Sequence, residues 1–251
     1  MAAKITRPRR FNVVCLTDWH VPFHDDRALQ VAFSLCKHIQ PSVIILHELH
    51  DFYRLSHFDQ DPSRIEGREL QNELDQVSVY LKKLRKCCPK SRIYLLESNH
   101  LNRLKRYLWR NARALASLRA MEIESLLNLA DHHIIFRKDV IIRNFLFKHG
   151  SIVRQHSSYT AKGEFLKEGM SGASGHTHRL GQYYATLRGG SYTWLECGCL
   201  CSLEPEWISG VPNWQHGLGL VSFKGNDDHF DARVIPIIDY EILWGNVNIK
   251  A

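Results

Sequence analysis

Histidine and carboxylate side chains gather in five short segments of this 251-residue chain, most of them directly after a hydrophobic run. The segments are TDWH (17–20), HELHD (47–51), SNH (98–100), KHG (148–150) and GHTH (175–178). In an extended segment, alternate side chains point to the same side. The spacing of Asp18 with His20, and of His176 with His178, therefore allows both members of each pair to bind one ion.

The types of these side chains indicate the class of ion. Carboxylate, imidazole and amide oxygen without thiolate suit divalent manganese, with iron, nickel or zinc as alternatives. The candidate ligands are too many for one tetrahedral ion, so we expect two divalent ions about 3.5–4 Å apart that share a carboxylate. Histidines in less informative contexts are interpreted as ordinary hydrogen-bonded residues, namely His24, His57, His133 and His216.

The hydrophobic pattern predicts strands that end where the polar segments begin. Continuous apolar runs predict buried strands within residues 11–18, 42–51 and 91–100. Apolar residues at helical spacing predict helices over 28–39, 65–87, 101–118, 123–130 and 159–169. Further strands are predicted within 133–136, 139–150, 192–201, 217–223 and 229–237. Because ligands gather at the carboxyl ends of strands in α/β sheets, we expect the polar segments to meet within one α/β domain.

Composition and charge narrow the class of protein. No apolar run approaches the roughly 20 residues of a membrane span, and the basic N-terminus lacks the apolar core of a secretory signal. We therefore expect a cytoplasmic protein without membrane contact. The net charge of +7 fits an anionic partner such as nucleic acid or a nucleotide, although solubility alone would also account for it. The seven cysteines are interpreted as buried free thiols rather than zinc ligands or disulfides.

In this order the polar segments resemble the motif series of the calcineurin-like metallophosphoesterase family, which is DxH, GDxxD, GNH, a later His and GHxH. The match spans about residues 12 to 178. Four segments resemble a compact, phage-type branch of the family. They are RYLWRNA (106–112), HSSYTAKGEF (156–165), GHTHRLGQYY (175–184) and PNWQHG (212–217). The resemblance implies a four-layer α/β/β/α sandwich in a single domain over residues 11–251, preceded by a flexible basic arm over 1–10. If the protein is phage-encoded, the host cytoplasm is its expected location.

The resemblance also implies a role for each matching residue. One metal ion would be held by Asp18, His20 and His178, and the other by Asn99, His149 and His176. Glu48 stands where the family has its bridging aspartate. The two cations would activate a bridging water in line with the leaving group.

Three further residues complete the implied site. His100 would be the general acid that protonates the leaving oxygen. Asp51 would hydrogen-bond the His100 imidazole and so fix its tautomer. Arg103, just past the third motif, would help neutralise a substrate phosphate, or else it is a solvated helix arginine.

Three positions depart from the family's pattern: His47 and Ser98 replace glycine, and Glu48 replaces aspartate. A side chain at a glycine position costs on the order of 1 kcal/mol or more if φ is positive. Glu48 is one methylene longer, which predicts a bridging glutamate with shifted ions, a single-metal site or a changed metal preference. His47 and His50 are alternatives for a compensating ligand.

The surrounding sequence favours a phosphodiesterase or nuclease that acts on nucleic acid or a nucleotide. Phe52-Tyr53 follows the second motif, where the protein phosphatases of the family have Arg-Gly. Basic residues interleaved with Tyr107 and Trp109 make residues 101–130 a candidate helical lid that suits phosphates and bases, unless these aromatic rings pack on the core. The alternatives are a phosphomonoesterase and a metal-binding module weakened by Glu48.

Overall fold

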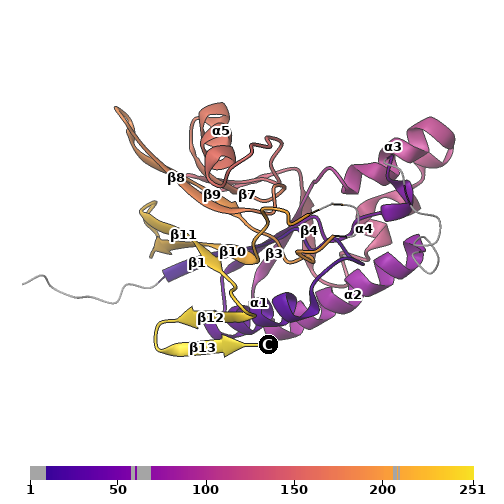
Figure 1. The fold of residues 1–251 in the computed structure, drawn as a ribbon. Helices are drawn as coiled ribbons and strands as arrows, with labels where there is room; N and C mark the ends of the chain where they lie inside the picture. Colours follow the sequence, from indigo (N-terminus) through magenta and orange to yellow (C-terminus); the bar gives the residue numbers. More distant parts are fainter. Residues whose placement is uncertain (1–9, 58–59, 61–68, 206–207, 209) are drawn as a thin grey trace, which may run out of the picture.

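The computed structural model describes residues 10–57, 60, 69–205, 208 and 210–251, which fold into two packed β-sheets with helices on both outer sides (Figure 1). The predicted basic arm lies outside the described residues except for Arg10, where the first strand begins. Most of the predicted start of the helix over 65–87 also lies outside them.

The larger sheet has six strands in the order β11-β10-β1-β2-β3-β4. Strands β1 to β4 run parallel, whereas β10 pairs antiparallel with both β1 and β11. Because parallel neighbours end at the same edge of a sheet, the loops after β1, β2 and β3 lie close together. The strands are β1 (Arg10–Thr17), β2 (Val43–His47), β3 (Arg92–Leu96), β4 (Ile134–Arg137), β10 (Gly217–Lys224) and β11 (Phe230–Pro236).

The smaller sheet has five strands in the order β5-β6-β7-β9-β8. In its centre β6, β7 and β9 run parallel, so the loops after β6 and β7 also share one edge. Its strands are β5 (Val140–Ile142), β6 (Phe145–Phe147), β7 (Ser171–Ser174), β8 (Leu180–Leu187) and β9 (Gly190–Cys197).

Helices cover the outer faces of both sheets (Figure 1). Helices α1 (Asp26–Ile39) and α2 (Leu70–Cys87) pack on the larger sheet, and α5 (Tyr159–Glu168) packs on the smaller one. Two further helices, α3 (Leu101–Asn111) and α4 (Ile123–Leu126), lie between β3 and β4 in the chain. Within the described ranges, no helix is long and apolar enough to cross a membrane.

Strand β1 shows how a continuous apolar run serves two cores at once. Val14 and Leu16 join the core that the larger sheet forms with α1 and α2. Val13 and Cys15 point the other way, into the core between the sheets, because side chains alternate across a strand. A third core joins α5 to the smaller sheet. Three cores separate four layers, and the expected α/β/β/α sandwich is confirmed.

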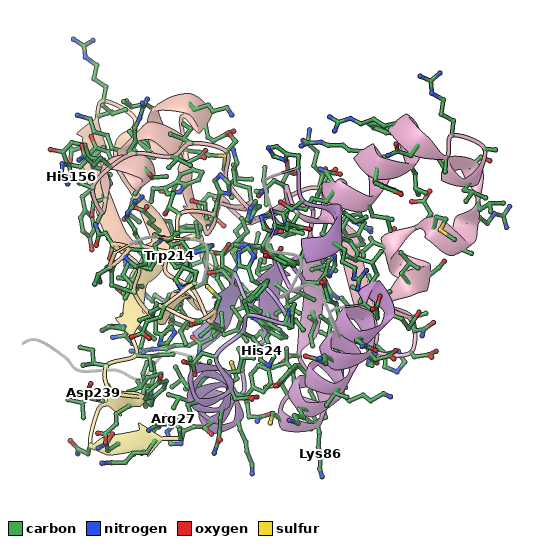
Figure 2. The ribbon with its side chains drawn as sticks, turned by 45° about the vertical axis from the view of Figure 1, so that its right-hand side comes forward. His24, Arg27, Lys86, His156, Trp214 and Asp239 are labelled. Carbon is green, nitrogen blue, oxygen red and sulfur yellow. The ribbon has the colours of Figure 1, made fainter. Side chains whose placement is uncertain are left out.

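A C-terminal hairpin extends the helical layer beside α1. It consists of β12 (Glu241–Trp244) and β13 (Val247–Lys250), whose Ile242 and Ile249 join the core of α1 and α2. Arg27 of α1 lies over the ring of Tyr240, 3.8 Å from its centroid. Figure 2 labels Arg27 and Asp239, the residue before Tyr240, at the lower left of the molecule.

Several elements differ from the sequence-based prediction. Strand β7 reads SGAS and has no apolar pattern, β8 is largely solvent-facing, and the β12–β13 hairpin is short, so all four strands were missed. The helix predicted over 101–118 ends at Asn111, and that over 123–130 covers only Ile123–Leu126. Between them the chain forms two short 3₁₀ turns, because few leucines of this region reach the core.

We expect Gly172→Ala to destabilise the smaller sheet, because a β-carbon at Gly172 would lie 2.5 Å from Cζ3 of Trp194 and 2.8 Å from the carbonyl oxygen of Leu146. Overpacking of this kind costs about 1–3 kcal/mol, which lowers Tm by roughly 2–12 °C for a chain of this size. Thermal unfolding followed by circular dichroism measures the change. Ser191→Ala, at an exposed position of β9, is the control. An unchanged Tm in Gly172→Ala would contradict this packing.

Candidate metal centre

The carboxyl ends of five strands bring the predicted ligands to one place between the sheets. Asp18 follows β1 directly, Glu48 follows β2, and Asn99 lies in the loop after β3. The smaller sheet contributes His149 after β6 and His176 after β7. His20 and His178 complete the cluster, so all seven predicted ligands lie together.

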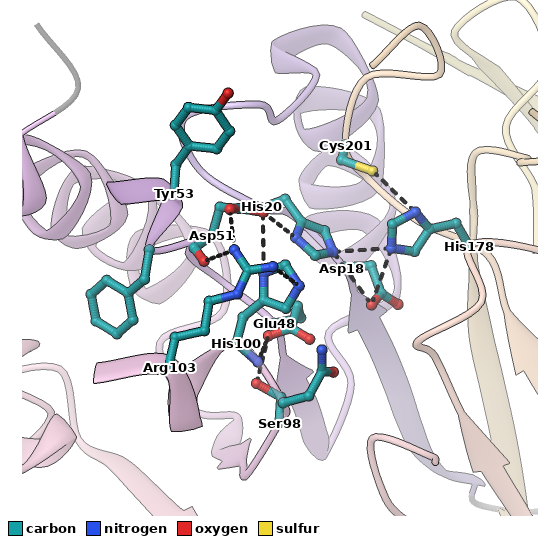
Figure 3. A network of polar contacts seen from close by, with 12 residues as sticks. Asp18, His20, Glu48, Asp51, Tyr53, Ser98, His100, Arg103, His178 and Cys201 are labelled. Carbon is teal, nitrogen blue, oxygen red and sulfur yellow. Dashed lines mark hydrogen bonds and ion pairs between the residues drawn. The ribbon is translucent and has the colours of Figure 1, made fainter. Parts of the chain in front are cut away.

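Asp18, His20 and His178 form the first group of donors (Figure 3). The Nε2 atoms of His20 and His178 face each other at 3.0 Å. They lie 3.8 Å and 3.7 Å, respectively, from Oδ1 of Asp18. Burial raises the pKa of Asp18, although the neighbouring imidazoles of His149 and His20 oppose this. Burial and the proximity of His20 hold the pKa of His178 well below its usual range, which leaves that imidazole neutral.

Glu48, His149 and His176 form the second group. Nε2 of His149 lies 2.9 Å from Oε2 of Glu48 and 2.6 Å from Oδ1 of Asn99. Burial alone would raise the pKa of Glu48, but the imidazoles of His100 and His149 hold it well below its usual range. Burial and His149 lower the pKa of His176 to about 4.

The donor set of both groups fits divalent cations. Imidazole nitrogens and carboxylate oxygens converge where solvent scarcely reaches, and Asn99 adds an amide oxygen. Borderline and hard divalent ions bind this mixture of nitrogen and oxygen donors.

The backbone at the ligands adopts a conformation that side chains disfavour. Positive φ angles occur at Asp18 (54°), His20 (51°), Glu48 (56°), His176 (73°) and His178 (61°). Such conformations cost on the order of 1–3 kcal/mol each and persist only where the surrounding structure enforces them. Five of the seven predicted ligands therefore carry backbone strain of this kind, which is common at functional sites.

Gly175 allows the two sheets to approach each other at the first group. The backbone N–H of His176 donates to Oδ2 of Asp18 at 3.0 Å. A β-carbon at Gly175 would lie 2.2 Å from that oxygen and 2.6 Å from Cε1 of His47. The glycine of the GHTH segment is thus required for space.

His47 occupies the cluster without the backbone penalty that a replaced glycine could bring. Neither His47 nor Ser98 has a positive φ; in the second motif this conformation falls on Glu48. Nδ1 of His47 lies 3.2 Å from Nδ1 of His149, and His47 forms a further donor group with Asp18 and His149. His50 instead packs against Phe52, and its ring nitrogens have no hydrogen-bond partner among the described residues.

Ser98 contacts the carboxylate of Glu48, the residue that is one methylene longer than the family's aspartate. Its Oγ donates a hydrogen bond to Oε1 of Glu48 at 2.7 Å, and the backbone N–H of His100 donates to the same oxygen at 3.1 Å. Glycine at position 98 would offer no hydroxyl. Two of the departures from the family's pattern are therefore in direct contact.

Asp51 links His20, His100 and Arg103 (Figure 3). Its Oδ2 lies 3.1 Å from Nδ1 of His20 and 3.1 Å from Nδ1 of His100. Arg103 donates to Oδ1 of Asp51 at 2.6 Å, and its Nη2 lies 2.9 Å from Nε2 of His100. Burial would raise the pKa of Asp51, but the contacts with His100 and His20 lower it far below its usual range. Because its side chain is only 15% exposed, Arg103 is not a solvated helix arginine.

A cavity of about 510 Å³ opens over both groups. Its wall includes His100 and Arg103 together with two aromatic residues that the motif pattern did not reveal, Tyr53 and Trp214. The Trp214 ring lies edge-on to His178, with 4.2 Å between the ring centroids. The cavity is thus lined by ionic groups on its floor and by aromatic rings at its side.

Glu73 of α2 forms hydrogen bonds with the backbone directly after the second motif, and no local sequence pattern indicated this contact. Its carboxylate accepts hydrogen bonds from the backbone N–H groups of Phe52 at 2.7 Å and Tyr53 at 3.2 Å. Burial, together with the nearby charge of Asp51, raises the pKa of Glu73 from 4.5 to about 8.

The raised pKa of Glu73 makes stability depend on pH. Between pH 4.5 and about 8 the folded chain keeps a proton that the unfolded chain has lost. The contribution is fully present below pH 4.5 and is lost as the pH rises through about 8. Glu73→Gln should therefore gain stability relative to the parent as the pH rises, by up to roughly 1.4 kcal/mol per pH unit. Urea unfolding from pH 4.5 to 8 tests this, with exposed Asp75→Asn as control; a constant difference would contradict it.

We further predict that Ser98 acts on metal affinity only through Glu48. Ser98→Ala should weaken binding of a divalent ion such as Mn²⁺ roughly ten-fold or more, because partners that orient a ligand typically contribute this much. In a Glu48→Asp background the same change should have little effect, since the shorter carboxylate no longer reaches the hydroxyl. Titration calorimetry on the four proteins measures the coupling. Equal losses in both backgrounds would show that the two residues act independently.

Comparison with known proteins shows a likeness over nearly the whole chain. No family model matches it. Over 245 residues it is 25% identical to the Gene 54 protein of Mycobacterium phage L5. The aligned region covers 90% of this chain and 93% of that protein. Among solved structures, Vps29 of Chaetomium thermophilum is similar, with 12% identity and a TM-score of 0.39 over 89% of this chain and 95% of that one. The chain is thus similar to a phage protein across most of its length.

Proposed function

We propose that this protein is a calcineurin-like metallophosphoesterase that hydrolyses phosphodiester bonds of nucleic acid or nucleotides. One observation carries the proposal. Members of two groups of buried imidazoles and carboxylates line a single cavity together with His100 and Arg103. The order of the motifs along the sequence supports the same assignment.

The residues that would hold two divalent ions, with manganese favoured, follow from the two donor groups. Asp18, His20 and His178 would hold one ion, and His149, His176 and Asn99, which contacts His149, would hold the other. Oε2 of Glu48, 2.9 Å from Nε2 of His149, would serve the second group, and His47 would offer an additional nitrogen. Bound divalent ions would lower the pKa of a coordinated water and offset negative charge on phosphoryl oxygens.

His100 is the residue that we propose for proton transfer to the leaving oxygen. Its Nδ1 lies against Oδ2 of ionised Asp51, so Nε2 is the nitrogen that would face the substrate, and proton donation requires the imidazolium form with a proton on each ring nitrogen. Arg103 lies 2.9 Å from that nitrogen. A substrate phosphate competes for the guanidinium, because charge-assisted hydrogen bonds to phosphate are stronger than a bond to a neutral ring. Binding of substrate would thereby free Nε2 to take up a proton from solvent and pass it to the leaving oxygen.

The diester is favoured over the monoester by the aromatic wall of the cavity. Tyr53 and Trp214 provide ring surface beside the ionic floor, which suits a phosphate with organic groups on both sides. Part of the Arg103 guanidinium already pairs with Asp51. The remaining part suits the single negative charge of a phosphodiester. The phosphomonoesterase remains the second reading within the same chemistry.

The decisive experiment compares the parent protein and His100→Ala on two diesters in the presence of Mn²⁺. We expect the parent to hydrolyse bis(p-nitrophenyl) phosphate and an oligonucleotide. Loss of a general acid costs about 10²–10⁴-fold, and the loss should be larger on the oligonucleotide, because p-nitrophenolate leaves without needing a proton. Metal content measured by mass spectrometry should be unchanged in His100→Ala.

Other outcomes select between the alternatives. Faster hydrolysis of p-nitrophenyl phosphate than of the diester indicates a phosphomonoesterase. An inactive parent that Glu48→Asp restores indicates a site weakened by the longer carboxylate. If Glu48→Asp is also inactive on monoesters, diesters and DNA, the proposed function is wrong.

A further inference from the structure

The segment from Leu101 to Met121 carries a strong excess of positive charge. It contains six arginine or lysine residues and no aspartate or glutamate. Arg103 contacts Asp51, whereas the other five side chains are exposed and form no ion pair with any carboxylate that the structure describes. These five are Lys105, Arg106, Arg110, Arg113 and Arg119.

Helical geometry places part of this charge on one face of α3. Leu101 and Leu108 are buried, and Leu104 packs partly against the core, so the apolar face of the helix is occupied by the protein itself. The sequence positions of Arg103, Arg106, Tyr107 and Arg110 are i, i+3, i+4 and i+7, which lie on a single face. We call these four residues the α3 stripe.

The α3 stripe begins in the cavity and continues onto the surface. Arg103 lines the cavity and touches His100, the proposed proton donor. Arg110 lies seven residues further along the helix, roughly 10.5 Å away along its axis. Between them Tyr107 is 46% exposed, so its ring is available to a ligand.

We propose that the α3 stripe binds a single-stranded nucleic acid and leads it into the cavity. Phosphates of the strand would pair with the guanidinium groups of Arg106 and Arg110, and an unpaired base would stack on Tyr107. A duplex keeps its bases stacked inside and offers none to this ring. The proposal rests on the proposed phosphoesterase function, since it supplies that site with its substrate.

An anionic membrane is a poorer match to the same charge. Helices that bind a membrane surface present a broad apolar face to the lipid beside their cations. On α3 that face is formed by Leu101, Leu104 and Leu108, which pack inward. Trp109, 53% exposed, lies instead on the side of Lys105, whose ammonium is 5.4 Å from its ring centroid.

The proposal is tested by measuring the fluorescence anisotropy of a labelled oligothymidylate that binds the protein. The strand has about 15 nucleotides, which is near the upper end of single-strand site sizes. The protein is used as purified, and a gel confirms that the strand stays intact. Arg106→Ala/Arg110→Ala should weaken binding at least ten-fold and reduce the slope of log K against log salt by roughly 1.4. Tyr107→Ala should weaken it roughly five-fold or more, and Tyr107→Phe should restore it, because stacking needs only the ring.

A matched control removes the same charge at the same spacing elsewhere. Lys82 and Lys86 are exposed on α2, four residues apart like Arg106 and Arg110. Figure 2 shows Lys86 projecting from the lower side of the molecule, away from α3 at the upper right. Lys82→Ala/Lys86→Ala should bind the strand within two-fold of the parent.

The proposal is overturned by several clear results. It is wrong if the parent does not bind the strand, if it binds a duplex of equal length as tightly, or if it binds only anionic lipid vesicles or a protein. It is also wrong if the control loses as much affinity as the stripe variant. A parent that binds through the stripe but hydrolyses no diester overturns the proposed function alone. A parent that hydrolyses bis(p-nitrophenyl) phosphate while the stripe variants bind normally overturns this inference alone.

Discussion

Three buried carboxylates at the junction of the two sheets set the main constraint on this structure. Asp18, Glu48 and Asp51 are at most 3% exposed, and a buried charge is tolerated only when it is paired and hydrogen-bonded. Each carboxylate is accordingly surrounded by imidazole, guanidinium or backbone N–H groups. The histidine-rich loops, the positive φ angles and the glycine at position 175 all follow from bringing these partners close.

This constraint explains why the site needs both sheets. The larger sheet presents the three carboxylates, whereas His149, His176 and His178 come from the smaller one. The sheets in turn are held together by an apolar core in which β1 and β2 meet β6, β7 and β9. Packing thus fixes the distance between donors, and the donors offset charges that the packing has removed from water.

The hydrophobic pattern was sufficient to predict an α/β domain and the convergence of the five polar segments, whereas the four layers were expected only from the resemblance to a known family. Apolar runs identify buried strands reliably, and parallel strands must end at one edge. It could not reveal β7, because SGAS carries no apolar pattern, nor Trp214 and Glu73, which reach the site only through tertiary packing. Tyr107 and Trp109 were equally ambiguous, since a helical pattern does not say whether an aromatic ring faces core or solvent. Both rings are exposed because Leu101 and Leu108 of the same helix occupy the side that faces the core.

Glu48 illustrates how a longer side chain is accommodated in so constrained a place. Its Oε1 accepts hydrogen bonds from Ser98 and from the backbone of His100, both in the loop after β3. Its Oε2 faces His149 of the smaller sheet. One carboxylate therefore spans the gap between the sheets, and each oxygen has its own partners. An aspartate one methylene shorter would reach fewer of these groups, so the serine and the glutamate are best understood as a matched pair. Glu48 and Ser98 then form one consistent geometry that joins the second motif to the third.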